Sequence, residues 1–228
     1  LLDLLLQQGA RPYKRVLEIG CGTGLLTHLL LRRISGMDEL FLNDLVPDFA
    51  CRLALECTER APTVHFLPGD IETLPLPGCF DLIISSSALH WLDDIGGLLT
   101  KLAVCLKPGG IIAFSLYGPN NLHEIRELTG LGLPCHSLPE LTNLLDSSLS
   151  LLHGSEEQAQ LHFASPQEVL RHLRQTGVNA LSRSPWNRAR LEQFCAAYRR
   201  RFSAGGRVTL TYHPMYCLSS KACVRKEL

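Results

Sequence analysis

The first half of the chain alternates between short apolar runs and longer stretches in which apolar residues recur at helical spacing. Short apolar runs bounded by turn residues are typical of strands buried on both faces, whereas helical spacing predicts amphipathic helices. We expect strands at 16–19, 40–42, 64–67, 80–85 and 111–117, and helices at 1–8, 23–33, 47–59 and 95–106. Five alternations of strand and helix predict a doubly wound α/β fold.

The pattern changes after Pro119, where the regular alternation is lost. Leucine-rich helical stretches and a capping-box-like start at Asn121-x-x-Glu124 indicate that residues 119–164 form an inserted helical lid. Residues 165–228 are expected to complete the sheet. This last part should contain a helix that starts at Ser165-Pro166, a basic helix at 187–202 and a strand at 208–218.

Three glycines at alternate positions follow the first expected strand, in Glu18-Ile19-Gly20-Cys21-Gly22-Thr23-Gly24. Glycine lets the backbone turn sharply and lets a ligand approach without a Cβ in the way. The spacing differs from the G-x-G-x-x-G fingerprint of dinucleotide-binding folds, because Leu25 stands where that fingerprint has its last glycine. A glycine-rich turn without a ligand is the alternative.

Polar residues follow the later strands at the edge where open α/β sheets bind ligands. Asp44 ends the second expected strand, 24 positions after Gly20, and we expect it to accept hydrogen bonds from ribose hydroxyls. The alternative is a solvated aspartate that caps the next helix. His90 and Trp91 follow the fourth strand and are expected near the reacting group. His90 is a base, a hydrogen-bond donor or a packed histidine, and Trp91 is pocket wall or core.

Composition narrows the classes of partner and compartment. The 228 residues carry no net charge at pH 7, so no global field indicates nucleic acid or a membrane as partner. The charge is uneven, because residues 181–228 contain ten basic and two acidic residues. Nine cysteines without a C-x-x-C pair or zinc-ligand spacing predict reduced thiols, a cytoplasmic protein and no metal site. No apolar run approaches the ~20 residues of a membrane span.

The motif Glu18-x-Gly20-x-Gly22-x-Gly24 resembles the first motif of the Rossmann-like, class I S-adenosyl-L-methionine-dependent methyltransferases. The resemblance implies a seven-stranded sheet, residues 1–118 as the cofactor-binding half, and a glycine loop around the methionine part of the cofactor. It also implies that Asp70 lies beside the adenine amino group, with Ile71 against the ring; a plain turn aspartate is the alternative. The implied cofactor site consists of Glu18, Gly20, Cys21, Gly22, Gly24, Asp44, Leu45, Asp70, Ile71 and Ser85. Glu18 either reaches the cofactor through the loop or only holds the loop in place.

Later segments resemble a narrower family, the malonyl-[acyl-carrier-protein] O-methyltransferases of biotin synthesis. These segments are 114–125, 163–166, 176–181 and 210–212. The resemblance implies methylation of the free malonyl carboxylate on an acyl carrier protein, by an enzyme that we expect to be a monomer. We expect a segment that precedes the first helix in this family to be missing here.

The candidate catalytic residues are His90, Trp91 and Tyr117, and the candidate substrate ligands are Arg126, Arg207 and Tyr212, with Arg171 and Arg174 as further cations. A carboxylate acceptor is ionised at neutral pH and needs no general base, whereas a phenol or an enol would need one. We therefore expect turnover that does not depend on a group titrating near neutral pH.

The basic helix is a candidate docking face for an acidic carrier protein, through Arg188, Arg190, Arg199 and Arg201. Two other hypotheses remain open. One is a methyltransferase that acts on another small acid or on a quinone-precursor ring. The other is a non-catalytic subunit that retains the fold.

Overall fold

The computed structural model describes residues 1–9, 11–49, 62–176 and 187–222. The chain divides into two compact units. Unit 1 consists of Leu1–Leu116, Ser137–Ser155 and Met215–Leu228, and unit 2 consists of Tyr117–His136 and Glu156–Pro214. The helix predicted over 47–59 lies almost entirely outside the described residues.

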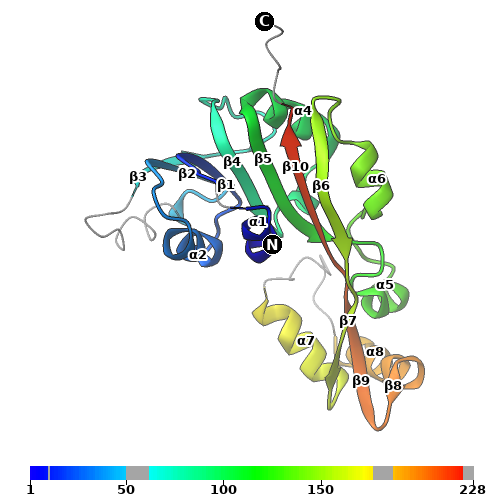
Figure 1. Ribbon diagram of the computed structural model, residues 1–228. Coiled ribbons are helices and arrows are strands. Elements are labelled where there is room, and N and C mark those ends of the chain that lie inside the picture. The colour runs from blue at the N-terminus through cyan, green and yellow to red at the C-terminus, as the bar shows by residue number, and fades with distance from the viewer. Residues whose placement is uncertain (10, 50–61, 177–186, 223–228) are drawn as a thin grey trace, which may run out of the picture. The chain divides into compact units, whose positions relative to one another are not determined.

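Seven strands form the sheet of unit 1, in the order β3-β2-β1-β4-β5-β10-β6 (Figure 1). Their bounds are Arg15–Ile19 (β1), Glu39–Asp44 (β2), Thr63–Pro68 (β3), Phe80–Ser86 (β4), Leu106–Tyr117 (β5), Leu149–Glu156 (β6) and Pro214–Lys221 (β10). Strand β1 pairs in parallel with β2 and β4, β2 with β3, and β4 with β5. The chain therefore crosses from β3 to the other side of β1, which makes the carboxyl ends of β1 and β4 a topological switch point where ligands bind.

Alternate residues of the central strands enter two hydrophobic clusters on the two faces of this sheet. Leu82 of β4 and Ile111 of β5 pack in the cluster that contains α1 and α2. Their neighbours Ile83 and Ile112 pack in the cluster that contains α4 and α6. The helices are α1 (Leu2–Gln7), α2 (Leu25–Arg33), α4 (Ile95–Cys105) and α6 (Leu138–Asn143). Burial on both faces is the reason that these strands are continuous apolar runs, and it confirms the predicted doubly wound fold.

Unit 2 contains a three-stranded sheet in the order β7-β9-β8, with both pairs antiparallel. Its elements are α5 (His123–Thr129), β7 (Ala159–Phe163), α7 (Pro166–Gln175), α8 (Arg188–Arg201), β8 (Ser203–Ala204) and β9 (Arg207–Tyr212). One cluster joins Ile125 of α5, Leu173 of α7, Tyr198 of α8 and Leu210 of β9. The Tyr198 ring is fully buried, and its hydroxyl donates to the Thr209 carbonyl at 2.7 Å.

The structure differs from the predicted division at residues 119–164, which do not form one helical lid. Strand β6 joins the seven-stranded sheet and buries Leu149 in its core, so α6 and β6 belong to unit 1. Helix α5 and strand β7 belong to unit 2. The strand predicted at 208–218 is two strands, because the chain leaves the small sheet at Tyr212 and enters the large one at Pro214.

Two helix starts show where local signals hold and where tertiary contacts override them. Ser165 accepts a hydrogen bond from the Glu168 N–H at 3.3 Å and caps α7 as predicted. The capping box predicted at Asn121 is wrong, because α5 begins after Leu122 without a side-chain cap. The Glu124 carboxylate is instead fully buried and accepts from Thr211 N–H at 3.0 Å and from Thr211 Oγ1 at 2.8 Å.

Within the described ranges, no helix is both long and apolar enough to cross a membrane. The same ranges hold six free cysteines and contain no group of three or more His, Cys, Asp or Glu residues that could hold a metal ion.

Candidate active site

The glycine loop follows β1 at the carboxyl edge of the sheet in unit 1. Gly20 has a φ of +71°, and a Cβ there would lie 2.3 Å from the Ala88 Cβ. Only glycine allows β1 and the segment after β4 to approach this closely. Gly22 has a φ of +50°, and a Cβ there would meet no atom within 4 Å. Gly22 therefore borders open space, as a ligand-binding loop requires, and Gly24 is the N-cap of α2.

Asp44 holds this loop by hydrogen bonds that the sequence did not predict. Its Oδ2 accepts from the Gly22 N–H at 2.8 Å, and its Oδ1 accepts from the Val46 N–H at 2.9 Å. The adjacent Leu45 is 71% exposed. Because each carboxylate oxygen has two lone pairs, Asp44 can still accept further hydrogen bonds from a ligand beside the loop.

Asn43 is a site residue that the sequence analysis missed. Its carbonyl accepts from the N–H groups of Gly20 and Cys21 at 2.9 and 3.0 Å. Its buried side-chain amide donates to the carbonyls of Leu67 and Gly69 at 2.8 and 2.9 Å. Asn43 thus ties together the ends of β1, β2 and β3. A polar residue inside a buried strand, next to Asp44, was the available signal.

Glu18 is 1% exposed and lies beneath the loop at the end of β1. Its Oε2 accepts a hydrogen bond from Thr27 Oγ1 of α2 at 2.7 Å. Burial in this apolar sheet raises the pKa of Glu18 to about 7, although the Thr27 hydrogen bond acts in the opposite direction. Glu18 is therefore poised between its neutral and ionised forms near neutral pH. Thr27 was also missed by the sequence analysis.

The loop after β3 is held from two sides. Asp70 Oδ1 accepts from the Glu72 N–H at 2.9 Å, which forms a local turn. Ile71 is buried in the core cluster, and its carbonyl accepts from Lys101 Nζ at 2.8 Å. Glu72 Oε1 accepts from the Asp94 N–H at 2.8 Å. These bonds place the loop of Asp70 firmly beside the edge of the sheet.

Ser85 and the turn Leu89–Trp91 form the side of the site that follows β4. Ser85 Oγ donates to the Ile19 carbonyl at 3.0 Å and joins the ends of β4 and β1. The His90 and Trp91 rings lie 5.3 Å apart, and Trp91 is 53% exposed. Burial lowers the pKa of His90 to about 4, so this imidazole is neutral at pH 7. A base with so low a pKa is poorly matched to proton abstraction at neutral pH.

Four further candidates lie in unit 2, namely Tyr117, Arg126, Arg207 and Tyr212. Of these, the structure places Tyr117 and Tyr212 next to each other. The Tyr117 and Tyr212 ring centroids are 6.1 Å apart. Arg207 stands at the opposite end of β9 from Tyr212, and its guanidinium donates to the His162 carbonyl at 2.8 Å. Arg126 donates to the Pro119 carbonyl. Both guanidinium groups therefore already donate hydrogen bonds to backbone carbonyls of unit 2.

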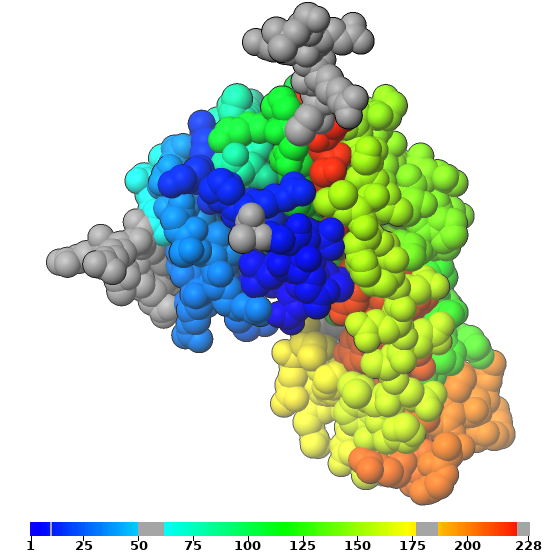
Figure 2. Space-filling view, viewed as in Figure 1, coloured from blue at the N-terminus to red at the C-terminus, as the bar shows by residue number. Residues whose placement is uncertain are grey.

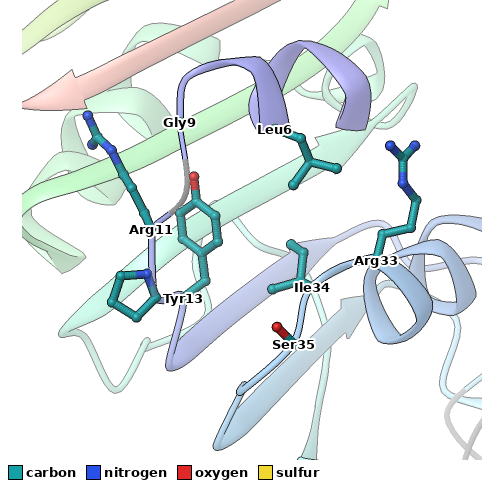
Figure 3. Close-up of a pocket in the computed structure, with 8 residues that line it drawn as sticks. Leu6, Gly9, Arg11, Tyr13, Arg33, Ile34 and Ser35 are labelled. Atoms are coloured by element: carbon teal, nitrogen blue, oxygen red, sulfur yellow. The ribbon is translucent and has the colours of Figure 1, made fainter.

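A separate pocket in unit 1 lies at the other end of the sheet (Figure 3). It is lined by Arg11 and Tyr13, which precede β1, and by Arg33 and Ile34 at the end of α2. Figure 3 shows Arg11 and Arg33 on opposite sides of the Tyr13 ring. The glycine loop follows the end of β1, so this pocket is distinct from the candidate active site.

Comparison with known proteins agrees with this geometry. A family model described as "Methyltransferase domain" matches residues 17–114. A putative methyltransferase from Bacillus halodurans has a similar fold, with a TM-score of 0.67, 14% identity and coverage of 97% of this chain and 98% of that one. The N-methyltransferase NodS from Bradyrhizobium japonicum, solved with S-adenosyl-L-homocysteine, has a TM-score of 0.55, 18% identity and coverage of 96% and 83%.

The fold and the loop define a Rossmann-like methyltransferase. A curated malonyl-[acyl-carrier protein] O-methyltransferase from Prosthecochloris aestuarii is 42% identical over 216 residues, which cover 93% of this chain and 78% of that protein. The chain belongs to the malonyl-[acyl-carrier protein] O-methyltransferase family.

Proposed function

We propose that this protein transfers a methyl group from S-adenosyl-L-methionine to the free carboxylate of a malonyl-acyl carrier protein, as an early step of biotin synthesis in the cytoplasm. The observation that carries the proposal is the 42% identity with such an enzyme along 93% of the chain. The loop from Gly20 to Gly24, with open space at Gly22 and a carboxylate beside it, supports a bound cofactor.

In this proposal the residues of unit 1 hold the cofactor. The glycine loop takes the methionine part, Asp44 accepts from the ribose hydroxyls, and Asp70 and Ile71 face the adenine. The cofactor supplies an activated methyl group on a sulfonium sulfur. The chain itself must then hold the acceptor at the right distance and angle, which is the main requirement of an in-line displacement.

The acceptor needs no base from the protein. A malonyl carboxylate is ionised at neutral pH, and the neutral His90, with its pKa of about 4, matches a site that donates hydrogen bonds or excludes water and does not remove a proton. We assign the carboxylate to the phenol of Tyr212, beside Tyr117, as a hydrogen-bond donor. Both tyrosines belong to unit 2.

The test is a methyl-transfer assay with product mass as the readout. The protein, S-adenosylmethionine and malonyl-acyl carrier protein should yield a carrier heavier by one methyl group. Free malonate, a small malonyl thioester and a quinone-precursor phenol are the comparison acceptors. Methylation of free acids or the phenol alone would overturn the assigned substrate. Failure to bind S-adenosylhomocysteine in calorimetry would favour a non-catalytic subunit.

A carrier protein that is strongly acidic also needs a docking face, and α8 is the candidate. Its arginines lie at the surface of unit 2, where α8 is orange in Figure 2. Arg188 pairs with Glu192 at 2.9 Å and Arg201 pairs with Glu127, so part of the charge is neutralised within the unit. Arg199 contacts the neutral Gln167 at 3.4 Å, which leaves its positive charge available.

We expect the double charge reversal Arg190→Glu and Arg199→Glu to raise KM for malonyl-acyl carrier protein by about tenfold, because attraction becomes repulsion. Rates with a small malonyl thioester should stay unchanged, and the effect should shrink as salt rises. The matched control reverses two arginines of unit 1, Arg11 and Arg32. Equal loss on the carrier-bound and the small substrate would assign these arginines to folding and not to docking.

A further inference from the structure

A histidine of α7 and the tyrosine that ends β9 form a hydrogen-bonded pair in unit 2. His172 Nε2 lies 2.9 Å from the Tyr212 hydroxyl, and the two rings are nearly perpendicular, at 87°. This distance is that of an ordinary hydrogen bond between a ring nitrogen and a hydroxyl. The proposed methyl transfer gives His172 no part.

The surroundings hold the imidazole in place. The Phe163 ring of β7 packs against His172, with the centroids 5.2 Å apart. On the same helix Val169 and Leu173 are buried in the core of unit 2, which fixes the rotation of α7 about its axis. The imidazole is therefore a fixed partner for whatever lies at its Nε2.

The backbone on both sides of Tyr212 is also fixed. Thr211 is held by the buried Glu124 through two hydrogen bonds. The neighbouring His213 is 4% exposed. Its ring Nδ1 accepts from the Asn120 N–H at 3.1 Å, and its backbone N–H donates to Asn121 Oδ1 at 3.2 Å. These bonds fix the backbone of Tyr212, and its ring is held by contacts with Tyr117 and His172. We therefore treat the direction of the hydroxyl proton as its remaining freedom.

That direction decides what the phenol can bind. A hydroxyl has one proton to donate and two lone pairs that accept. If Tyr212 donates to His172, only lone pairs remain, and these repel a carboxylate. If His172 Nε2–H donates to the phenolic oxygen, the proton of Tyr212 remains for an anion. Burial raises the pKa of Tyr212, although a side-chain hydrogen bond with Thr176 acts in the opposite direction, so the phenol keeps this proton at neutral pH. Thr176 Oγ1 donates its own proton to the His172 carbonyl at 3.1 Å.

We propose that His172 is a positioning residue whose Nε2–H donates to Tyr212 and turns the phenol proton toward the malonyl carboxylate. The inference rests on the proposed function, in which Tyr212 binds that carboxylate. It adds a residue and a tautomer, because Nε2 must carry the proton. The centroid of the Tyr117 ring lies 6.1 Å from that of the Tyr212 ring.

The test is a double-mutant cycle on methyl transfer to malonyl-acyl carrier protein. His172→Leu should raise KM by about fivefold to tenfold, the effect of one hydrogen bond, with kcat changed less than twofold. His172→Gln should retain most of the wild-type KM, because its amide N–H can donate to Tyr212. Tyr212→Phe should raise KM similarly, and His172→Leu should add nothing in the Tyr212→Phe background.

Several outcomes overturn the inference. If the factors by which His172→Leu and Tyr212→Phe raise KM multiply in the double variant, His172 does not act through the Tyr212 hydroxyl. An unchanged KM in His172→Leu, or equal impairment in His172→Gln and His172→Leu, would contradict it too. His162→Leu, on the exposed side of β7, is the control for the loss of an imidazole. Wild-type protein that binds S-adenosylhomocysteine but leaves malonyl-acyl carrier protein unmethylated would overturn the proposed function itself, and this inference with it.

Discussion

Replacement of Asp44 by alanine is expected to weaken S-adenosylhomocysteine binding by about 100-fold. A carboxylate that accepts two ribose hydrogen bonds contributes about 1.5 kcal/mol or more for each, and a total near 3 kcal/mol corresponds to that factor. The substitution also removes the acceptor that holds the Gly22 N–H. Calorimetry measures the affinity, and the control is Asp38→Ala, an exposed aspartate just before the opposite end of β2. Wild-type affinity in Asp44→Ala would show that the ribose lies elsewhere.

A pair of glycine substitutions separates backbone strain from the loss of the binding space. Gly22 and Gly36 both have positive φ, at +50° and +74°, and a Cβ at either position meets nothing within 4 Å. Valine at either site should destabilise the fold by a similar amount, about 1–3 kcal/mol, because a β-branched residue is strained at positive φ. Only Gly22→Val should abolish cofactor binding, because its side chain fills the space beside the loop. Equal affinity in the two variants would contradict the placement of the methionine part.

Glu18→Gln is expected to stabilise the ligand-free protein at alkaline pH by up to about 3 kcal/mol. The folded pKa of Glu18, about 7, lies above its ordinary value of 4.5. A raised carboxyl pKa contributes stability that is fully present below pH 4.5 and is lost as pH rises through 7, at about 1.4 kcal/mol per unit. Glutamine keeps an acceptor for Thr27 Oγ1 and does not ionise. Urea unfolding at pH 5 and pH 8 measures the difference, which should be small at pH 5.

His90→Gln is expected to change the pH dependence of the free energy of unfolding in the opposite sense to Glu18→Gln. The folded pKa of His90, about 4, lies below its ordinary value of 6.5, so its contribution is fully present above pH 6.5 and is lost as pH falls through 4. In the wild type the slopes of Glu18 and His90 oppose each other between pH 4.5 and 6.5. Stability should rise with pH across this window in Glu18→Gln and fall in His90→Gln. Identical slopes in the two variants would mean that neither carboxyl nor imidazole is desolvated in the folded protein.

The positions of the first five strands along the chain, the glycine loop and the helices α7 and α8 could be predicted from the sequence, but the strands of the second half could not. Strand β6 has mostly exposed residues between Leu149 and Glu156, so its sequence lacks a clear buried face. At His213 the chain passes from one sheet to the other, and Pro214, which has no N–H to donate, is the first residue of β10. This proline was the one local signal for a break in the expected strand. Which sheet a strand joins depends on its distant partners, and no local pattern encodes them.

Among the candidate site residues the same distinction holds. The carboxylate at Asp44 was predicted, whereas its hydrogen bond with the Gly22 N–H was not. The hydrogen bonds from the Asn43 amide to the loop after β3 and from the Thr27 hydroxyl to Glu18 were not predicted either. These contacts join different elements that the fold brings together. The sequence indicated a ligand site at this edge of the sheet, and the structure identified the hydrogen bonds that fix the loops around it.

The sequence by itself determined the features that depend on a few neighbouring residues. The turn at the glycines after β1, the cap at Ser165 and the apolar runs of β4 and β5 follow from backbone sterics, one hydrogen bond or residue spacing. Only the tertiary structure decided the buried carboxylate of Glu124, 87 residues from Thr211, the raised pKa of Glu18 and the pairing of His172 with Tyr212. Burial and contacts between distant residues exist only once the chain has folded, which is the reason that these properties could not be predicted from the sequence.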